Sequence, residues 1–333
     1  MNKGDLAVKI QEMAKLAGVS PSTVSRVFSN HRNVSGEVRE RVFALARAHG
    51  YHPRLTGKQR NVVIVTPYDS VYPVQSCVDM LLMALTQALP LRGFRVEILP
   101  VNNLERLNNI QFCAAAAIGV EQRDFPEWAE HFAAPLVILD RSPGKAQENV
   151  FFVHSDEKQG METAIAHFRD CACRKIGCLI HGTADCGNAL IRKKAVLAAL
   201  KKYAFPAEER LVCFTGTGTD AYVELTGKML RNGVDAFFCP GGNAGIVLPY
   251  ALSLYNRKIP EDISLIASEQ TFYSRFAVPP QTTITQDYPG LADAVCSLVE
   301  NLLDNRKDVV LRETVLPYRL IVRESVSAGV IQK

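Results

Sequence analysis

A short segment near the N-terminus gathers side chains whose chemistry suits nucleic acid. Small residues let a backbone approach a DNA groove, hydroxyl groups reach phosphates or base edges, and an arginine offers two parallel hydrogen bonds to guanine. If residues 21–28 form a helix with its valines inward, the outer face carries Pro21, Ser22, Thr23, Ser25 and Arg26. This pattern predicts the recognition helix of a helix-turn-helix.

Two flanking helices must hold that face in place. Gly18 and Ser20 separate the first helix from the second, because glycine tolerates a left-handed turn and a serine hydroxyl caps free N–H groups. Pro21 suits the first helical position. A third helix is predicted from the Ser35 cap to about His49. The apolar spacing predicts that the three helices bury Ile10, Met13, Ala14, Ala17, Val24, Val27, Phe28, Val38, Val42, Leu45 and Ala46.

The plainer alternative is a small helical bundle with solvated Ser and Arg side chains. We favour the DNA-reading interpretation because capping, turn and surface chemistry agree along one contiguous run.

The segment from Ile10 to Pro53 resembles the head of the lactose-repressor (LacI/GalR) family of bacterial transcription regulators. The motifs that carry the resemblance are Ala17-Gly18-Val19-Ser20, Thr23-Val24-Ser25-Arg26-Val27, Val34-Ser35 and Gly50-Tyr51-His52-Pro53. The resemblance implies that Pro21, Ser22 and Arg26 read bases in the major groove. It also implies phosphate contacts, which fix register rather than sequence, from Ser20, Thr23, Ser25, Asn33 and Ser35.

Charge is concentrated in this head. Residues 1–60 hold eleven Lys and Arg against four Asp and Glu, a net charge of +7, so the remainder carries about −3 to give the total of +4. A cationic head attracts DNA by releasing counterions, which makes affinity fall with salt. The sequence therefore predicts double-stranded DNA as a partner.

Length and composition indicate a globular body behind the head. Of 333 residues, 47% are hydrophobic and 22% charged, and the roughly 275 residues after the head suffice for two ordinary domains. No apolar run approaches the ~20 residues of a membrane span, and the first residues do not resemble a signal peptide. We expect a cytoplasmic protein without membrane association.

Nine cysteines are scattered along the chain. Cys171, Cys173 and Cys178 suggest a metal site, but no second cysteine pair follows at zinc spacing and Cys178 lies in an apolar strand pattern. We expect reduced thiols and no metal or other cofactor.

Short apolar runs alternate with helical patterns through the body, which predicts α/β architecture with parallel sheets covered on both faces. Strands are expected at residues 62–66, 95–99, 114–118, 136–140, 176–180, 211–214, 236–239 and 263–267. Helices are expected at 78–89, 160–170, 191–203, 221–232 and 248–255, followed by late segments at 291–301 and 315–322.

The body also resembles the same family, whose ligand domain is similar to periplasmic sugar-binding proteins. The motifs are Ser155-Asp156, Gly160, Ala164, His167-Phe168, Ile259-Pro260-Glu261-Asp262-Ile263-Ser264 and Pro279-Pro280-Gln281-Thr282-Thr283-Ile284-Thr285-Gln286, the last of which places a third crossing strand before the helix from Leu291. We expect a head over residues 1–53, a short linker or reduced hinge over 54–60 and a body over 61–333. Its two doubly wound subdomains are predicted at about 61–150 plus 287–310, and 151–285 plus 311–325.

Candidate effector residues follow from this resemblance and from strand ends. Arg192 aligns with the family's effector-binding arginine, and its guanidinium suits bidentate contact with hydroxyls, a carboxylate or a phosphate. Gly241-Gly242 and Glu269 replace carboxylate and amide groups that normally hold sugar hydroxyls, which argues against a simple hexose. The full candidate set is Tyr68, Asp69, Tyr72, Asp156, Arg192, Gly242, Asn243 and Glu269, and the expected effector is a carbohydrate or a related metabolite.

Two segments depart from the family pattern. The chain passes from Pro53 directly to Arg54-Leu55-Thr56-Gly57-Lys58, about five residues short of the family's minor-groove hinge helix. Leu55 is the candidate wedge between bases, whereas the alternative is a basic linker. Between Leu99 and Ala114 the asparagine-rich sequence is a poor crossover helix, so we expect one helix to be reduced or lost.

Together these features predict a homodimeric repressor, with no catalytic residues, that binds a palindromic operator and is controlled by a small ligand between the subdomains. Three alternatives remain open: a regulator that has lost its effector, a solute-binding protein and an enzyme. The basic head argues against a solute-binding protein. No Gly-x-Ser-x-Gly, Gly-Lys-Ser/Thr or His-Glu-x-x-His motif favours an enzyme.

Overall fold

The computed structural model describes residues 9–31, 33–49, 51, 60–67, 76–216, 220–304, 306 and 309–327. The chain divides into two compact units. The N-terminal unit comprises Met1–Ser70, Leu81–His154 and Pro289–Thr314, and the C-terminal unit comprises Val71–Met80, Ser155–Tyr288 and Val315–Lys333. The chain thus passes from one unit to the other mainly between residues 154 and 155, 288 and 289, and 314 and 315. The sequence predicts these boundaries at 150–151, 285–287 and 310–311.

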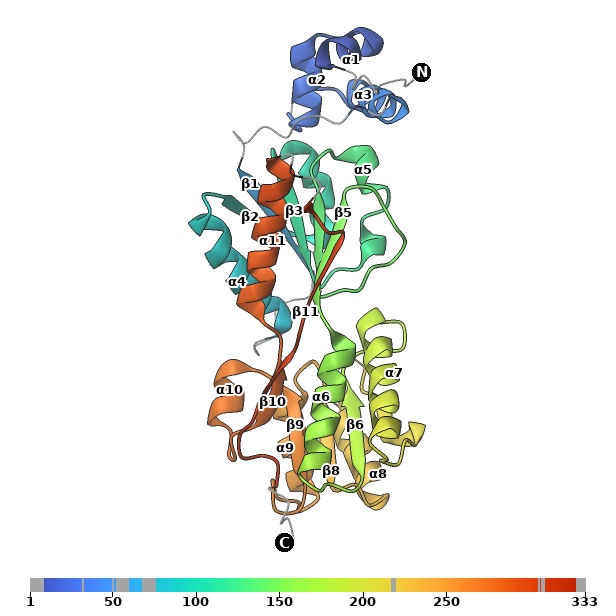
Figure 1. Ribbon diagram of the computed structural model, residues 1–333, viewed down its shortest axis with the longest axis vertical. Coiled ribbons are helices and arrows are strands. Elements are labelled where there is room, and N and C mark those ends of the chain that lie inside the picture. Colours follow the sequence, from blue (N-terminus) through green and yellow to red (C-terminus); the bar gives the residue numbers. More distant parts are fainter. Residues whose placement is uncertain are drawn as a thin grey trace. The chain divides into compact units, whose positions relative to one another are not determined.

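Three helices form the head as the sequence predicts: α1 (Ile10–Ala17), α2 (Pro21–Phe28) and α3 (Gly36–Ala48) (Figure 1). Gly18 ends α1 with a left-handed φ of 64°, which glycine adopts without steric strain. The helices close around a small core of buried side chains, namely Met13, Ala14, Ala17, Val24, Val27, Val42, Phe43 and Ala46.

The prediction that Ile10 belongs to the core of the head is wrong. Ile10 is 36% exposed, because it is the first residue of α1 and lies one turn before Met13 and Ala14, the residues that the core buries. A spacing rule identifies the inward face of a helix, but it does not say where the neighbouring helices stop covering that face.

The N-terminal unit is built on a six-stranded sheet of order β11-β5-β4-β3-β1-β2. The pairs β1–β2, β1–β3, β3–β4 and β4–β5 are parallel. Its elements are β1 (Asn61–Thr66), α4 (Cys77–Leu91), β2 (Arg95–Pro100), η1 (Val101–Asn109), β3 (Ala114–Ile118), η2 (Gln122–Asp124), α5 (Trp128–His131), β4 (Leu136–Leu139), β5 (Val150–Ser155), α11 (Tyr288–Leu303) and β11 (Glu313–Leu316).

The crossover between β2 and β3 is reduced, which confirms the expectation for this asparagine-rich segment. It forms the 3₁₀ helix η1, which contains a non-helical residue at Asn103. Asparagine side chains compete for backbone hydrogen bonds, and this weakens an α-helix.

The C-terminal unit carries a second six-stranded sheet, of order β12-β10-β9-β8-β6-β7. All of its pairs are parallel except β10–β12, which is antiparallel. Its elements are α6 (Glu157–Asp170), β6 (Ile176–Ile180), α7 (Gly187–Lys202), η3 (Glu209–Leu211), β7 (Val212–Phe214), α8 (Asp220–Arg231), β8 (Ala236–Cys239), α9 (Ala244–Leu254), β9 (Ser264–Ser268), α10 (Thr271–Phe276), β10 (Thr282–Thr285) and β12 (Arg319–Ile321).

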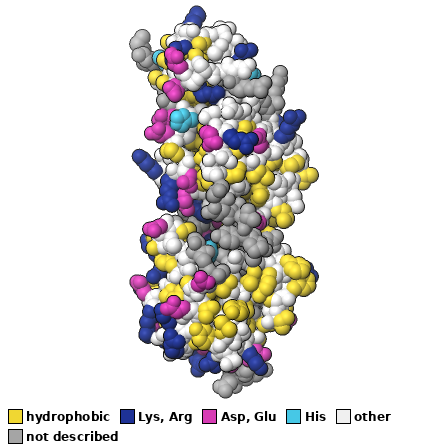
Figure 2. Space-filling view, turned by 180° about the vertical axis from the view of Figure 1, so that it is seen from behind, with side chains coloured by type: hydrophobic (Ala, Val, Ile, Leu, Met, Phe, Trp, Pro, Cys, Tyr) yellow, Lys and Arg dark blue, Asp and Glu magenta, His cyan; other side chains and the backbone are white. Residues whose placement is uncertain are grey.

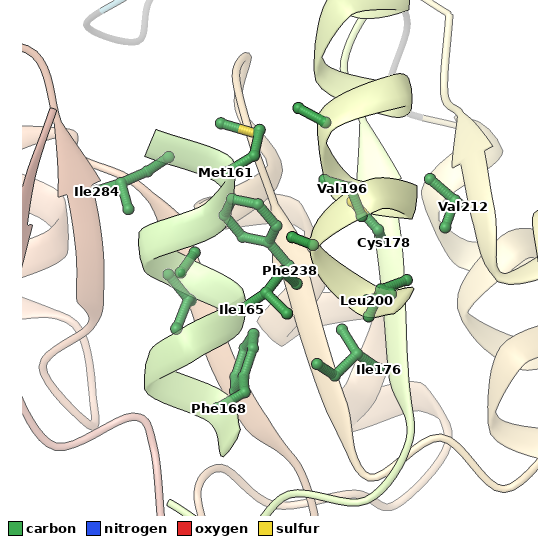
Figure 3. Packing of buried hydrophobic residues seen from close by; sticks show 14 of the residues in the cluster. Met161, Ile165, Phe168, Ile176, Cys178, Val196, Leu200, Val212, Phe238 and Ile284 are labelled. Carbon is green, nitrogen blue, oxygen red and sulfur yellow. The ribbon is translucent and has the colours of Figure 1, made fainter. Parts of the chain in front are cut away.

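Alternate residues of each strand face opposite cores, because side chains of a strand point to alternate faces. Cys178 and Phe238 belong to the core on one face of the sheet, whereas Leu179 and Phe237 belong to the core on the other. Figure 3 shows the first core, where residues of α6 and α7 pack over the strands, including Met161, Ile165, Phe168, Val196 and Leu200.

The strands expected from apolar runs are all present within a residue or two, and β5 is an additional strand that those runs do not predict. The late segment at 315–322 contains the end of β11 and the whole of β12: β11 pairs in the first sheet and β12 in the second. Pro317 lies between them and lacks the N–H that a continuous strand would use.

No helix among the described residues is long and apolar enough to cross a membrane. Each of the nine cysteines is a free thiol, and no group of three metal-binding side chains occurs in the part of the chain that the structure describes. Burial raises the pKa of Cys173 to about 11, so this thiol is protonated at neutral pH.

The core predicts a large effect of truncating Phe238, which is fully buried between α6, α7 and the sheet. Phe238→Ala should lower the free energy of unfolding by about 3–5 kcal/mol, since it removes buried area and leaves a cavity. Urea unfolding measures this. Val322→Ala is the control, because Val322 is 62% exposed, and an equal loss in both variants would contradict the packing described.

Candidate functional site

The outer face of α2 presents the expected recognition residues. Pro21, Ser22, Ser25 and Arg26 are exposed, whereas Thr23 is half-buried. Within the described residues no carboxylate forms an ion pair with Arg26. No described carboxylate thus neutralises its guanidinium, which suits a group that binds a phosphate or a base edge.

Hydroxyl groups organise the start of α2. Ser20 Oγ accepts a hydrogen bond from the Thr23 N–H at 3.1 Å and lies 2.7 Å from Ser22 Oγ and 2.8 Å from Thr23 Oγ1. The expected cap is therefore present. Because the first N–H groups of a helix carry partial positive charge, this end also suits a phosphate.

Asn33 and Ser35 are exposed between α2 and α3. The Val38 N–H lies 3.4 Å from Ser35 Oγ, so Ser35 also begins α3. Their expected phosphate contacts stay predictions. The candidate wedge Leu55 and most of the linker lie outside the described residues.

A second cluster of polar groups lies at one edge of the C-terminal sheet. The parallel strands β6, β8, β9 and β10 all end at this edge, which is where doubly wound sheets bind ligands. The loops that follow carry His181, Gly241 and Gly242, Glu269 and Gln270, and Gln286. We call this set of loops, with the starts of α6 and α7, the carboxyl edge.

Arg192 of α7 is bound to a carboxylate of the chain itself. Its Nε donates to Glu157 Oε2 at 2.8 Å, and its Nη2 donates to Glu157 Oε1 at 2.6 Å. Both side chains are largely buried, with exposed fractions of 12% for Arg192 and 5% for Glu157. The bidentate contact expected with an effector is thus occupied by Glu157. The contact of Arg192 with an effector stays a prediction.

Further polar side chains complete this network. Tyr318 donates its hydroxyl hydrogen to Glu157 Oε1 at 3.2 Å, and the Gln286 amide donates to the Tyr318 oxygen at 3.1 Å. Asn188 Nδ2 approaches Glu157 Oε1 at 3.5 Å. The network joins α6, α7, the residue that follows β10 and the segment before β12.

Two consecutive glycines make room at the edge. A Cβ at Gly241 would lie 2.6 Å from Arg192 Nη1, and one at Gly242 would lie 2.3 Å from the His181 ring. Both glycines also have positive φ angles, of 85° and 57°, which favour glycine. Gly242 thus shapes the site through its backbone.

Glu269 is engaged by a second internal arginine. Arg323 donates to both of its carboxylate oxygens, at 2.9 and 3.0 Å, and Thr283 donates to the same carboxylate. The Glu269 side chain is 8% exposed. Its expected contact with an effector is untested, and its charge is already paired.

The remaining candidates differ in setting. Asn243 Oδ1 lies 3.5 Å from Nε2 of Gln270, a residue outside the candidate set that also donates from Nε2 to the Gly242 carbonyl at 2.8 Å. The buried Gln270 Oε1 has no hydrogen-bond partner among the described residues. Asp156 caps α6 by accepting from the Gln159 N–H at 3.0 Å. Tyr68, Asp69 and Tyr72 lie outside the described residues.

Sequence reasoning missed Glu157, Tyr318 and Gln270. Glu157 follows Asp156 at the start of α6, where an acidic residue is expected for the helix dipole alone. Its partner Arg192 is 35 positions away, so only the tertiary structure identifies the pair.

Comparison with known families places both parts of the chain. The sequence model described as "Bacterial regulatory proteins, lacI family" matches residues 9–54, and the one described as "Periplasmic binding protein-like domain" matches residues 165–326. The chain belongs to the lacI family. As a lacI-family protein it is a transcriptional regulator with a helix-turn-helix head, and it is not an enzyme.

Curated lacI-family relatives match along almost the whole chain. The HTH-type transcriptional regulator DegA of Bacillus subtilis is 25% identical over 96% of this chain and 98% of its own. The ribose operon repressor of Lactococcus lactis is also 25% identical, over 95% and 97%.

Solved structures share the fold. A complex of the transcriptional regulator CelR with cellobiose has a TM-score of 0.70 at 23% identity and covers 96% of this chain and 99% of its own. A lac repressor dimer bound to operator has a TM-score of 0.65 at 20% identity, with 97% and 100% covered.

The carboxyl edge predicts an acid-dependent loss of stability. The pKa of His181 is lowered from 6.5, mainly because the ring is buried and secondly because Arg192 carries a positive charge nearby. The unfolded chain therefore binds this proton at higher pH than the folded chain, so the free energy of unfolding falls as pH decreases below 6.5. His181→Asn should reduce that slope by at most ~1.4 kcal/mol per pH unit.

Urea unfolding at several pH values measures the slope. The exposed His49 of the head provides the control, as His49→Asn should leave the slope as in the parent protein. Burial also lowers the pKa of His167. Because His167 is present in all three proteins, it contributes equally to the pH slope of each. An unchanged slope in His181→Asn would contradict the electrostatic account of this edge.

Proposed function

We propose that this regulator is a cytoplasmic repressor that binds a palindromic operator as a homodimer and responds to a small molecule at the carboxyl edge. The observation that carries the DNA-binding part is the outer face of α2, a helix that the Ser20 cap fixes at its start. This face carries hydroxyl groups and Arg26, which forms no ion pair with any described residue. Each head would read one half-site in the major groove.

An exposed apolar surface supports a dimer. In the C-terminal unit, α9, α10 and the loop after α10 expose five large apolar side chains, three of them strongly: Phe272 at 73%, Phe276 at 62% and Val278 at 98%. The other two are Tyr250 and Leu254. Figure 2 shows hydrophobic side chains gathered on one side of this unit. A contiguous exposed apolar surface is typical of a protein interface.

The carboxyl edge supports a ligand that donates hydrogen bonds. The buried Gln270 Oε1 lacks a partner among the described residues, and a buried acceptor of this kind is costly unless it receives a hydrogen bond. A hydroxyl group would supply one. The relatives named for cellobiose and ribose support a carbohydrate or a related metabolite.

Selection of DNA duplexes from a random pool tests the DNA-binding proposal. The parent protein should enrich a palindrome, whose two halves reflect a two-fold symmetric dimer. Arg26→Ala should lose discrimination at one base pair of each half-site, which corresponds to about 1–3 kcal/mol. Sequencing the retained duplexes measures this.

Arg41→Ala is a suitable control, because Arg41 lies on α3 beside Glu37 and outside the recognition face. It should keep the base preference of the parent. Enrichment of no sequence by the parent protein, or an identical preference in Arg26→Ala, would contradict the proposed reading of DNA by α2.

A charge placed in the apolar surface tests the dimer. Phe272→Asp should shift the protein from dimer to monomer in sedimentation experiments, because it introduces an unpaired charge into a desolvated contact. The weight-average mass should fall toward half. Val322→Asp, at a position 62% exposed in the same unit, should remain dimeric. A parent protein that sediments as a monomer would overturn the homodimer.

A further inference from the structure

Glu157 occupies the two N–H donors of Arg192 that an anionic ligand would need. We call these two donors, on Nε and Nη2, the fork of Arg192. A guanidinium binds a carboxylate or a phosphate by two parallel N–H groups. Here Nε and Nη2 of Arg192 already donate to the two oxygens of Glu157, at 2.8 and 2.6 Å. A ligand carboxylate can occupy this fork only after the Glu157 carboxylate has left it.

Several contacts keep Glu157 in that position. Its residue lies in the first turn of α6, where negative charge is favoured. Tyr318, whose hydroxyl donates to Glu157, is itself fixed on α6: its N–H donates to Gln159 Oε1 at 2.8 Å, and its ring lies over Gly160. A Cβ at Gly160 would come within 2.6 Å of Tyr318 Cδ2.

Burial makes displacement of Glu157 unfavourable. Only 5% of the Glu157 side chain is exposed. If Glu157 released Arg192, its negative charge would remain buried in surroundings of low polarity without a partner of opposite charge. The second charged pair of the edge, Glu269 with Arg323, is satisfied in the same way. The paired charges of the edge therefore cancel.

We propose that Glu157 is a specificity-determining residue that fills the fork of Arg192 and thereby excludes carboxylate and phosphate ligands from the carboxyl edge. The edge then accepts uncharged molecules that donate hydrogen bonds, in keeping with the buried acceptor at Gln270 Oε1. This proposal deepens the proposed function, on which it rests for the presence of a ligand at this edge.

Removal of the Glu157 carboxylate tests the proposal. Acetate and inorganic phosphate are titrated by calorimetry into the purified protein without DNA, at constant ionic strength. The parent should show no measurable binding of either anion. Glu157→Ala should bind at least one of them with a dissociation constant at least tenfold below the weakest binding that the titration of the parent could detect. The double variant Glu157→Ala/Arg192→Ala should lose this gain.

Two further variants make the test specific. Glu157→Gln keeps the shape of the side chain and should show a smaller gain of the same kind if Glu157→Ala does not fold. Glu162→Ala is the matched control, because it removes a carboxylate from the same helix whose partner is Lys202 on the surface. It should bind the anions no better than the parent.

Equal anion binding by the parent and Glu157→Ala would overturn the proposal, as would a gain that persists without Arg192 or appears in Glu162→Ala. Absence of anion binding in both Glu157→Ala and Glu157→Gln would overturn it too. Because these titrations contain no DNA, failure of operator selection would leave their outcome unaffected, so the two failures are distinguishable.

Discussion

The ion pair between Glu157 and Arg192 is the interaction on which the carboxyl edge depends. It joins the first turn of α6 to α7, and through Tyr318 and Gln286 it reaches the segment before β12 and the end of β10. Two charges can remain at such low exposure only if they satisfy each other and their remaining lone pairs. The positions of four chain segments are therefore set by one requirement for charge neutralisation.

The architecture makes that requirement unavoidable. Parallel strands place all their following loops at one edge, and helices on both faces bury the sheet, so polar residues of those loops meet in a partly enclosed space. The glycines at 241 and 242 leave room there for Arg192 and His181. The edge holds two internal charge pairs, Glu157 with Arg192 and Glu269 with Arg323.

Local features of the sequence were sufficient for the head. Gly18, the Ser20 cap and the spacing of Val24 and Val27 act within a few residues of each other, and the structure confirms them. The exposure of Ile10 was not predictable in this way, because it depends on how far α2 and α3 extend. The asparagine-rich segment before β3 was predictable, since its poor helix propensity is a property of the segment itself.

The carboxyl edge was predictable only in part. Arg192 could be identified through its resemblance to a family position, and the strand ends indicated the correct edge of the sheet. Its pairing with Glu157 and that of Glu269 with Arg323 join residues 35 and 54 positions apart. Such pairs leave no periodic signal in the sequence, so the charge state of the site emerges only from the tertiary structure.

A double-mutant cycle at Glu157 and Arg192 measures how strongly the two side chains stabilise each other. The free energy of unfolding is measured for the parent, Glu157→Gln, Arg192→Gln and the double variant. We expect each single variant to lose about 3–5 kcal/mol, because each leaves a buried charge unpaired, and the double variant to lose clearly less than the sum. Additive losses within about 0.5 kcal/mol would show that the two side chains are independent and would contradict this account.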